Sequence, residues 1–154
     1  MFHVVLYEPE IPPNTGNIIR LCANTGAKLH LIQPLGFTLD DSKLRRAGLD
    51  YREFSQVTEH ANLAAFTADI QPPRLFAIST RGKRRYSDVA FAPNDAFLFG
   101  PESRGLPTTL LDEMSSECIL RIPMLAHNRS LNLSNAVTAV VFEAWRQHHF
   151  AMAQ

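Results

Sequence analysis

Residues 130–135 read Ser-Leu-Asn-Leu-Ser-Asn ahead of an apolar, helix-like run, and they concentrate the small polar side chains that hold ligands. Ser130, Asn132, Ser134 and Asn135 are more capping groups than one helix can use, since a single Ser or Asn satisfies the first free backbone N–H groups. The surplus predicts that a ligand binds at the start of this helix.

Two earlier stretches share this polar character. Residues 14–20 read Asn-Thr-Gly-Asn-Ile-Ile-Arg, and residues 99–107 read Phe-Gly-Pro-Glu-Ser-Arg-Gly-Leu-Pro. Gly100 and Gly105 suit a backbone that turns sharply or approaches a ligand. The common nucleotide-binding loops do not match, because no Lys-Ser or Lys-Thr pair follows Gly105 and no Gly-x-Gly occurs in the sequence. A nucleoside-like ligand would need a site of another design.

Strand-like and helix-like segments alternate along the chain, which predicts an α/β fold with a mostly parallel sheet and helices on both faces. Pro12 and Pro13 are expected to prevent a helix before Asn14, which then caps a helix that stops at Gly26. The length predicts a single domain, residues 1–154. Strands are expected at residues 2–7, 28–33, 74–79, 96–99 and 118–122, and further helices at residues 41–47, 58–70, 107–114 and from 132 onward.

The strands that end near Ile78, Gly100 and Ile122 should share one edge of a parallel sheet, so their loops can converge on one pocket. A basic cluster, Arg-Gly-Lys-Arg-Arg at residues 81–85, follows the first of these strands. Short basic runs are usually solvated loops, but this position at the ligand-binding edge predicts contact with RNA. The predicted RNA-binding residues are Arg81, Lys83, Arg84 and Arg85, and a weaker basic cluster comprises Lys43, Arg45, Arg46 and Arg52.

The composition sets limits on the function. With 15 basic and 15 acidic side chains the formal net charge is zero, so RNA contact must come from local patches. Cys22 and Cys118 lie far apart and are expected to be buried free thiols, and the six histidines form no metal motif. No apolar run approaches the roughly 20 residues of a membrane span, and no secretory leader is visible, so a cytoplasmic location is expected.

Taken in order, the three polar stretches resemble the three motifs of the SPOUT class of RNA methyltransferases, over almost the whole chain. The resemblance implies transfer of a methyl group from S-adenosylmethionine, without a metal, to the ribose 2'-hydroxyl of the wobble cytidine or uridine in leucine tRNAs. It also implies a C-terminal trefoil knot, which no periodicity argument could propose, and a homodimer. The first motif begins by Asn14, so the catalytic domain itself is expected to bind tRNA.

The resemblance also assigns roles to single residues. Glu102 is expected to offset the sulfonium charge of the cofactor, and its alternative role is a salt bridge with Arg104 or Arg121. Arg20 is a poor general base, because a guanidinium stays protonated in proteins, so we expect it to clamp RNA phosphate or a developing alkoxide unless it is only a surface arginine. The catalytic positions are Asn14, Arg20, Glu102, Ser130 and Asn132, and the cofactor-binding positions are Ile78, Thr80, Gly100, Gly105, Ile122, Met124, Ser130 and Leu131.

Phe142 lies on the wrong side of the last helix for a core residue. At about 100° per residue it falls roughly 160° from the centre of the apolar stripe, near Ala144. Thr138, Asn135 and Arg146 flank it, and an apolar anchor in a polar surround is typical of an interface hot spot. An ordinary exposed phenylalanine is the alternative. With the dimer that the resemblance implies, Phe142 is predicted to lie at a two-fold interface.

Two functions from different classes remain open. The first is the tRNA ribose methyltransferase. The second is a non-catalytic RNA-binding or nucleoside-binding module that keeps the cofactor pocket. The presence of Arg20, Glu102, Ser130 and Asn132 favours the enzyme.

Overall fold

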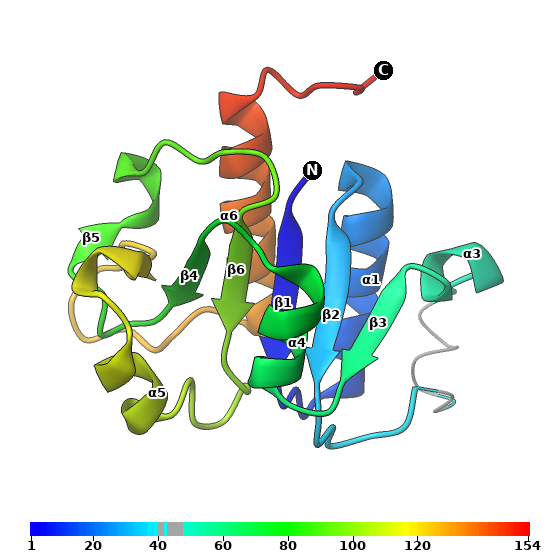
Figure 1. Cartoon of the computed structure of the whole chain (residues 1–154), viewed down its shortest axis with the longest axis horizontal. Helices are drawn as coiled ribbons and strands as arrows, with labels where there is room; N and C mark the ends of the chain where they lie inside the picture. Colours follow the sequence, from blue (N-terminus) through cyan, green and yellow to red (C-terminus); the bar gives the residue numbers. More distant parts are fainter. Residues whose placement is uncertain (40–41, 43–47) are drawn as a thin grey trace.

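A seven-stranded parallel sheet forms the centre of the computed structural model, which describes residues 1–39, 42 and 48–154 (Figure 1). The strand order is β3-β2-β1-β6-β4-β7-β5, and every neighbouring pair is parallel, as predicted. The helix expected at residues 41–47 falls almost wholly outside the described residues, as do Lys43, Arg45 and Arg46. The strands are β1 (His3–Tyr7), β2 (Lys28–Ile32), β3 (Val57–His60), β4 (Leu75–Ile78), β5 (Arg84–Arg85), β6 (Ala96–Phe99) and β7 (Ile119–Arg121).

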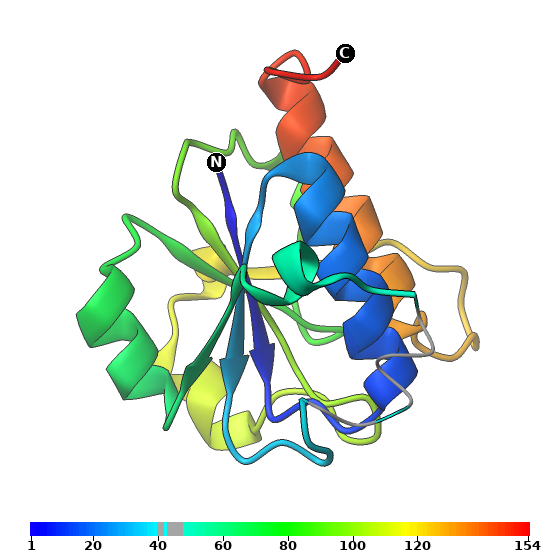
Figure 2. The same ribbon diagram turned by 90° about the vertical axis from the view of Figure 1, so that its right-hand side faces the viewer.

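Helices cover both faces of the sheet (Figure 2). On one face, Ile18 of α1 and Val141 of α6 belong to the same apolar cluster as Val4 of β1. On the other face, Phe66 of α4 belongs to a second cluster with Val5. Successive residues of β1 thus enter different cores, because side chains alternate along a strand. The helices are α1 (Pro12–Thr25), α3 (Tyr51–Phe54), α4 (Leu63–Ile70), α5 (Thr108–Glu113) and α6 (Leu133–Gln147), with short 3-10 turns η1 (Tyr86–Asp88) and η2 (Ser116–Cys118).

Helix α1 begins three residues earlier than the sequence predicts. Its N-cap is Ile11, and Pro12 and Pro13 occupy the first helical positions, where the N–H that proline lacks would have no partner in the helix. The expected cap, Asn14, is inside the first turn and is buried. Its side chain is thereby free to bond elsewhere. The predicted stop is confirmed, because Gly26 adopts a φ of 75° at the C-terminal end.

The helix predicted at residues 58–70 is wrong in its first part. Val57–His60 forms strand β3, which pairs with β2 so that Leu29 lies opposite Val57. The helix α4 starts only after Asn62, whose Oδ1 accepts a 2.8 Å hydrogen bond from the N–H of Ala65. Tertiary pairing with β2 therefore overrides the helix-like spacing of the apolar residues.

Helix α6 packs its apolar stripe against the sheet and α1. Val137, Val140 and Ala144 are each fully buried, as predicted. Asn132 caps the helix, since its Oδ1 accepts a 2.9 Å bond from the N–H of Ser134. Phe142 is 42% exposed, as the periodicity predicts, and its ring lies 5.8 Å from that of Trp145.

Candidate functional site

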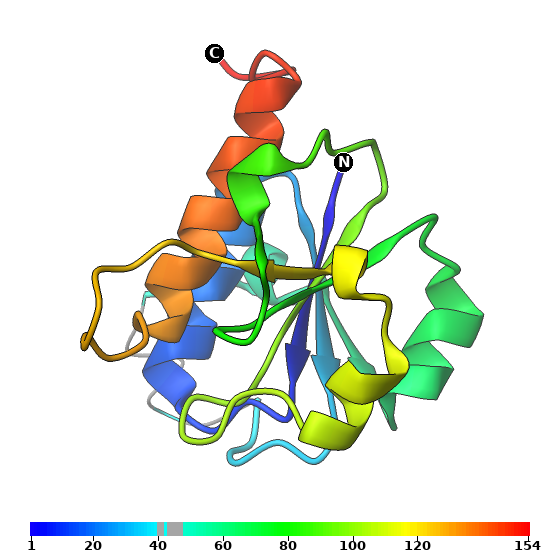
Figure 3. The same ribbon diagram turned by 90° about the vertical axis from the view of Figure 1, so that its left-hand side faces the viewer.

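The loops that carry the three polar stretches lie along one edge of the sheet. Strands β1, β6, β4 and β7 are successive neighbours and all parallel, so their carboxyl ends meet at this edge (Figure 1). The loop that joins β7 to α6, residues 122–132, extends outward beside α6 (Figures 2 and 3), and its C-terminal end reaches the beginning of α1, where Asn132 bonds Asn14. The carboxyl edge of an open parallel sheet is where such folds bind ligands.

Glu102 holds the loop that follows β1. Its Oε2 accepts a 2.8 Å bond from the backbone N–H of Glu10, and its Oε1 accepts a 3.1 Å bond from the N–H of Ile11. The amide of Asn14 donates to the same Oε1 at 3.3 Å. The second polar stretch is thus fixed to the first by one carboxylate. The alternative role, a salt bridge with Arg104 or Arg121, is not what the structure contains.

Asn14 joins the third polar stretch to this network. Its Oδ1 accepts a 2.9 Å hydrogen bond from Nδ2 of Asn132, and Asn14 itself is only 7% exposed. The Oδ1 of Asn132 in turn accepts from the backbone N–H and the hydroxyl of Ser134. The chain of bonds Glu102–Asn14–Asn132–Ser134 therefore connects all three stretches. Ser130 lies exposed in the same loop, two residues before Asn132.

Gly100 and Gly105 shape the loop that carries Glu102. A Cβ atom on Gly100 would come within 2.3 Å of the backbone nitrogen of Leu106, so only glycine fits there. Gly105 adopts a φ of 66°, in the left-handed region that favours glycine, and its N–H donates to the carbonyl of Pro101 at 3.0 Å. The tight turn predicted from the two glycines is confirmed.

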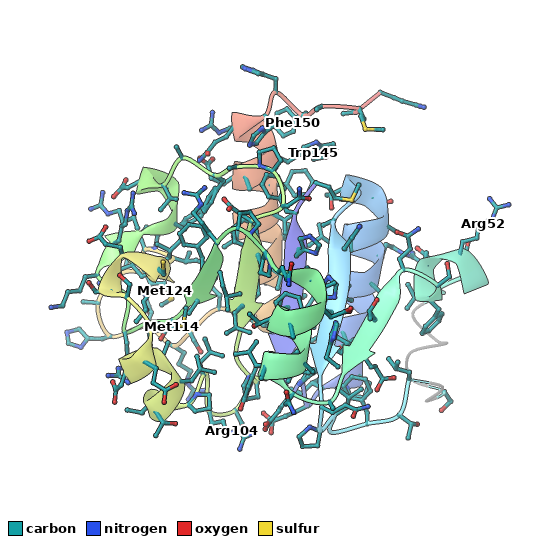
Figure 4. All side chains as sticks on the ribbon, in the orientation of Figure 1. Arg52, Arg104, Met114, Met124, Trp145 and Phe150 are labelled. Carbon is teal, nitrogen blue, oxygen red and sulfur yellow. The ribbon has the colours of Figure 1, made fainter. Side chains whose placement is uncertain are left out.

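Glu8, Glu10 and Ser103, to which the sequence assigned no role, also fasten this edge together with Arg104. The carboxylate of Glu10 accepts bonds from the N–H and the hydroxyl of Ser103, and these bonds, together with the Arg104 charge, lower the pKa of Glu10. Arg104 itself pairs with Glu8 and lies at the carboxyl edge (Figure 4). The sequence feature that could have indicated these contacts is the pair Glu8 and Glu10 on either side of Pro9, directly after the first predicted strand.

The predicted cofactor-binding residues gather around the same loops. Ile78 is the last residue of β4, and Ile122 and Met124 follow β7 and are half-buried (Figure 4). Leu131 is 44% exposed beside Asn132, although a leucine gains by burial. Apolar side chains and close-packed glycine backbone at a sheet edge fit a ligand with a nucleoside part. Thr80, also predicted here, is exposed in the loop after β4.

Arg20 stands apart from the network. It lies on α1 beyond Asn14, and its Nη2 donates a 2.6 Å bond to the carbonyl of Gly48. Its Nε lies 3.4 Å from Oε1 of Glu53. Arg20 is therefore held by α3 and the residues before it, and its side chain is 47% exposed.

The basic cluster lies at the predicted edge but is not a simple loop. Arg84 and Arg85 form β5 beside β7, with Arg85 opposite Arg121. Arg81 pairs with Asp112 at 3.3 Å, and Arg84 pairs with Glu117 at 3.4 Å. Lys83 is exposed. Acidic partners thus neutralise part of the cluster's charge.

Several features concern other classes of site. Among residues 1–39, 42 and 48–154, no group of three or more His, Cys, Asp or Glu side chains could hold a metal ion. Cys22 is buried, as expected, and burial raises the pKa of its thiol to about 12. Cys118 was also expected to be buried, but it is only half-buried. No helix in the described part of the chain is long and apolar enough to cross a membrane.

The described residues also line two hollows that lie outside the bonded network of Glu102, Asn14 and Asn132. One of about 700 Å³ separates α4 from α5 and is lined by Tyr7, Leu63 and Glu113 among others. The other, of about 470 Å³, lies at the carboxyl ends of β2 and β3.

Comparison with known proteins identifies relatives over nearly the full chain. Residues 1–142 match the model of the SpoU rRNA Methylase family. A tRNA (cytidine(34)-2'-O)-methyltransferase of Burkholderia pseudomallei is 61% identical over 152 residues, 97% of each chain. The enzyme of the same name from Escherichia coli K12 is 58% identical over 147 residues, 96% of this chain and 94% of its own.

Solved structures agree with these relatives. A structure described as giving insights into the 2-OH methylation of C/U34 on tRNA has a TM-score of 0.89 and 46% identity, over 97% of both chains. The SpoU methyltransferase AviRb from Streptomyces viridochromogenes, in complex with the cofactor AdoMet, has a TM-score of 0.81 and 25% identity. The match with AviRb covers 96% of this chain and 57% of the AviRb chain.

Proposed function

Because the chain belongs to the SpoU rRNA methylase family and is a methyltransferase that uses S-adenosylmethionine, we propose that it methylates the ribose 2'-hydroxyl of nucleotide 34 in tRNA. Relatives that are 56% to 61% identical over nearly their whole length carry this activity in their names. The observation within the molecule that supports the proposal best is the bonded chain Glu102–Asn14–Asn132, which unites all three motifs. The substrate nucleotide is the wobble cytidine or uridine.

The cofactor would be held by the loops after β4, β6 and β7. When bound, S-adenosylmethionine supplies the electrophilic methyl group. Ile78, Ile122, Met124 and Leu131 provide the apolar walls, and the glycine turn lets the backbone approach closely. Thr80 and Ser130 add exposed hydroxyl groups at the rim. The full proposed set is Ile78, Thr80, Gly100, Gly105, Ile122, Met124, Ser130 and Leu131.

Positioning is the main contribution of the catalytic loops. Methyl transfer needs the ribose oxygen in line behind the methyl group, and correct placement alone supplies several kcal/mol of the barrier reduction. Glu102, Asn14 and Asn132 fix one loop against the next, which defines where the reacting atoms sit. Ser130 lies exposed two residues before Asn132 in the same loop, and we propose that its hydroxyl group contacts the ligand. We therefore assign catalysis to Asn14, Arg20, Glu102, Ser130 and Asn132.

Arg20 acts through its charge. Its guanidinium keeps its proton, so it stabilises RNA phosphate or the developing alkoxide and does not remove the hydroxyl proton directly. The bonds to Gly48 and Glu53 hold the side chain ready for that contact. The cluster Arg81, Lys83, Arg84 and Arg85 adds phosphate contacts at the same edge of the sheet.

We also propose that the enzyme is a homodimer with Phe142 at the interface. Phe142 is 42% exposed, and its ring packs on Trp145, whose ring in turn contacts Phe150 at 5.4 Å. A second subunit placed on this aromatic group would bury it, and it would bring the α1 segment of one subunit near the cofactor loops of the other.

A trefoil knot forms the last part of the proposal. The segment that joins β4 to β5 must cross β7, because β7 lies between these strands. A Cβ on Gly82 would come within 2.6 Å of the Leu120 backbone, so the crossing is tight. Fusing a stable domain after Gln154 should slow folding of a knotted chain, because that domain must follow the C-terminus through the loop, whereas fusion before Met1 should not. Equal folding rates for both fusions would refute the knot.

The function is tested by mapping 2'-O-methyl groups in tRNA from cells that lack the protein. We expect loss at nucleotide 34 of leucine tRNAs, and restoration by the purified enzyme with S-adenosylmethionine. Enzyme and tRNA would meet in the cytoplasm. The rival function, a non-catalytic binding module, predicts unchanged methylation with retained RNA affinity, and loss at another nucleotide would refute the assignment to position 34.

A further inference from the structure

The hollow at the carboxyl ends of β2 and β3 lies on the edge that carries the catalytic loops. Its volume of about 470 Å³ falls within the roughly 300–1,000 Å³ typical of small-ligand pockets. Gln33, which follows β2, and Phe37, in the turn beyond it, line one side. Glu59 of β3 lines the other. The strand order places β2 next to β1, so the hollow adjoins the loop of the first motif.

The turn beside this hollow is bonded directly to the catalytic network. The N–H of Gly36 donates a 2.9 Å bond to the carbonyl of Pro9, and a Cβ on Gly36 would come within 2.9 Å of the Cα of Glu10. The N–H of Glu10 is in turn held by Glu102. The hollow and the catalytic loops thus form one continuous surface with a fixed spacing.

The chemistry of the hollow suits an unpaired RNA base. Phe37 is a half-buried aromatic ring, and single-stranded bases stack on such rings. Gln33 donates its Nε2–H to Oε2 of Glu59 at 2.8 Å, which orients the pair, and within the described part of the chain both Oε1 atoms are left to accept hydrogen bonds. Two acceptors favour a base with an exocyclic amino group. Adenine, cytosine and guanine have one and uracil does not.

We propose that this hollow is a second nucleotide subsite, which takes an unpaired, amino-bearing base of the substrate RNA near the methylated nucleotide. The proposal deepens the proposed function and rests on it. Phe37 stacks on the base, and the Gln33–Glu59 pair selects its amino group. The carboxylate also repels phosphate, so the subsite reads a base and not the RNA backbone.

Abasic scanning tests the subsite. Hairpin RNAs with the anticodon stem and loop would carry an abasic residue at each loop position in turn, except the methylated one. Binding would be measured without a methyl donor, so the result does not depend on whether nucleotide 34 is methylated. At one loop position, we expect an abasic residue to weaken RNA binding by the wild-type protein about tenfold, which is the scale of one lost stacking contact. The same abasic residue should not further weaken RNA binding by the Phe37→Ala variant. Independent losses at every position would overturn the proposal.

A second comparison tests the choice of base and does not depend on Phe37. At the coupled position, replacing the amino-bearing base by uridine should weaken binding to the wild type and not to Glu59→Ala, an exposed residue whose removal leaves the core intact. Glu113→Gln, in the hollow between α4 and α5, is the control and should keep the preference of the wild type. If Phe37→Ala does not fold, this comparison decides alone, and equal discrimination by Glu59→Ala and the wild type would refute the subsite.

Discussion

Asn132 donates a 2.9 Å hydrogen bond to Oδ1 of Asn14, although 118 residues separate them. The Oδ1 atom of Asn14 accepts this bond, and its Nδ2 group donates to Glu102, so both ends of the amide are hydrogen-bonded. Because Asn14 is nearly buried, neither bond is readily replaced by water. The side chain of Asn14 therefore fixes the relative position of the first and third motifs, together with the packing of α6 on α1.

Replacing Glu102 by Gln should destabilise the protein by about 1–3 kcal/mol. Glu102 accepts from three donors, whereas the amide of Gln places an NH₂ group against a backbone N–H. Urea unfolding of the variant measures the loss. Glu113→Gln, an exposed carboxyl at the end of α5, should change stability by less than about 0.5 kcal/mol. Equal stability of both variants would show that Glu102 does not fasten the loop.

Arg20→Ala should abolish methylation and leave the affinity for S-adenosylmethionine nearly unchanged, because Arg20 is bonded to Gly48 and Glu53 and not to the cofactor loops. Calorimetry with the cofactor and a methylation assay separate the two effects. Glu53→Gln, which weakens the ion pair with Arg20 and the bond that Glu53 accepts from the N–H of Asp50, should reduce the rate less than Arg20→Ala. A large loss of cofactor affinity would instead place Arg20 in the cofactor site.

Replacing Arg81, Lys83, Arg84 and Arg85 together by Ala should weaken tRNA binding and flatten its salt dependence. Each lost phosphate contact removes about 0.7 to 0.9 of a unit from the slope of log K against log salt. Arg81 and Arg84 already have acidic partners, so we expect Lys83 and Arg85 to account for most of the change. Lys28→Ala, exposed at the amino end of β2, is the control, and a slope equal to that of the wild type would exclude the cluster from the RNA site.

Stability should fall on acidification because two buried histidines, His3 and His30, have lowered pKa values. His3, His30 and His60 form a hydrogen-bonded row across β1, β2 and β3, with nitrogen separations of 2.9 and 3.0 Å. Burial and the neighbouring His3 and His60 lower the pKa of His30 to about 3, and burial lowers that of His3. The unfolded chain takes up protons below its ordinary pKa of 6.5 while the folded chain does not, so this stability is present above pH 6.5 and is lost as the pH falls.

The expected loss from His30 alone is about 2 kcal/mol between pH 7 and pH 5. Urea unfolding at the two pH values measures it. The variant His30→Gln, which cannot titrate but keeps a donor and an acceptor, should show a smaller difference between them. An unchanged difference would mean that other groups carry the pH dependence.

Phe142→Glu should yield monomers and reduce tRNA methylation more than cofactor binding. A carboxylate would have to be buried without a partner at the proposed interface. Sedimentation measures the assembly state, and Met152→Glu, at a side chain that is 98% exposed, is the matched control. A variant Phe142→Glu that is still dimeric and fully active would place the interface elsewhere.

The sequence predicts the sheet and the site loops better than the ends of the helices. Strand runs such as residues 96–99 are short and apolar on both sides, as parallel strands must be, and they were found correctly. The start of α1 was missed because Pro12 and Pro13 both break helices and begin them, depending on position. β3 was missed because its partner β2 is distant in the sequence. Asn14 was expected to cap α1, and its contacts with Glu102 and Asn132 have no local signal.

The packing of α1 against α6 determines when during protein synthesis the enzyme becomes active. Ile18 and Val141 share one apolar cluster, yet a ribosome adds the second more than a hundred residues after the first. Until then the newly made α1 exposes an apolar face that chaperones bind, and Asn14 lacks its partner Asn132. A nascent chain therefore has no assembled site until α6 has been made.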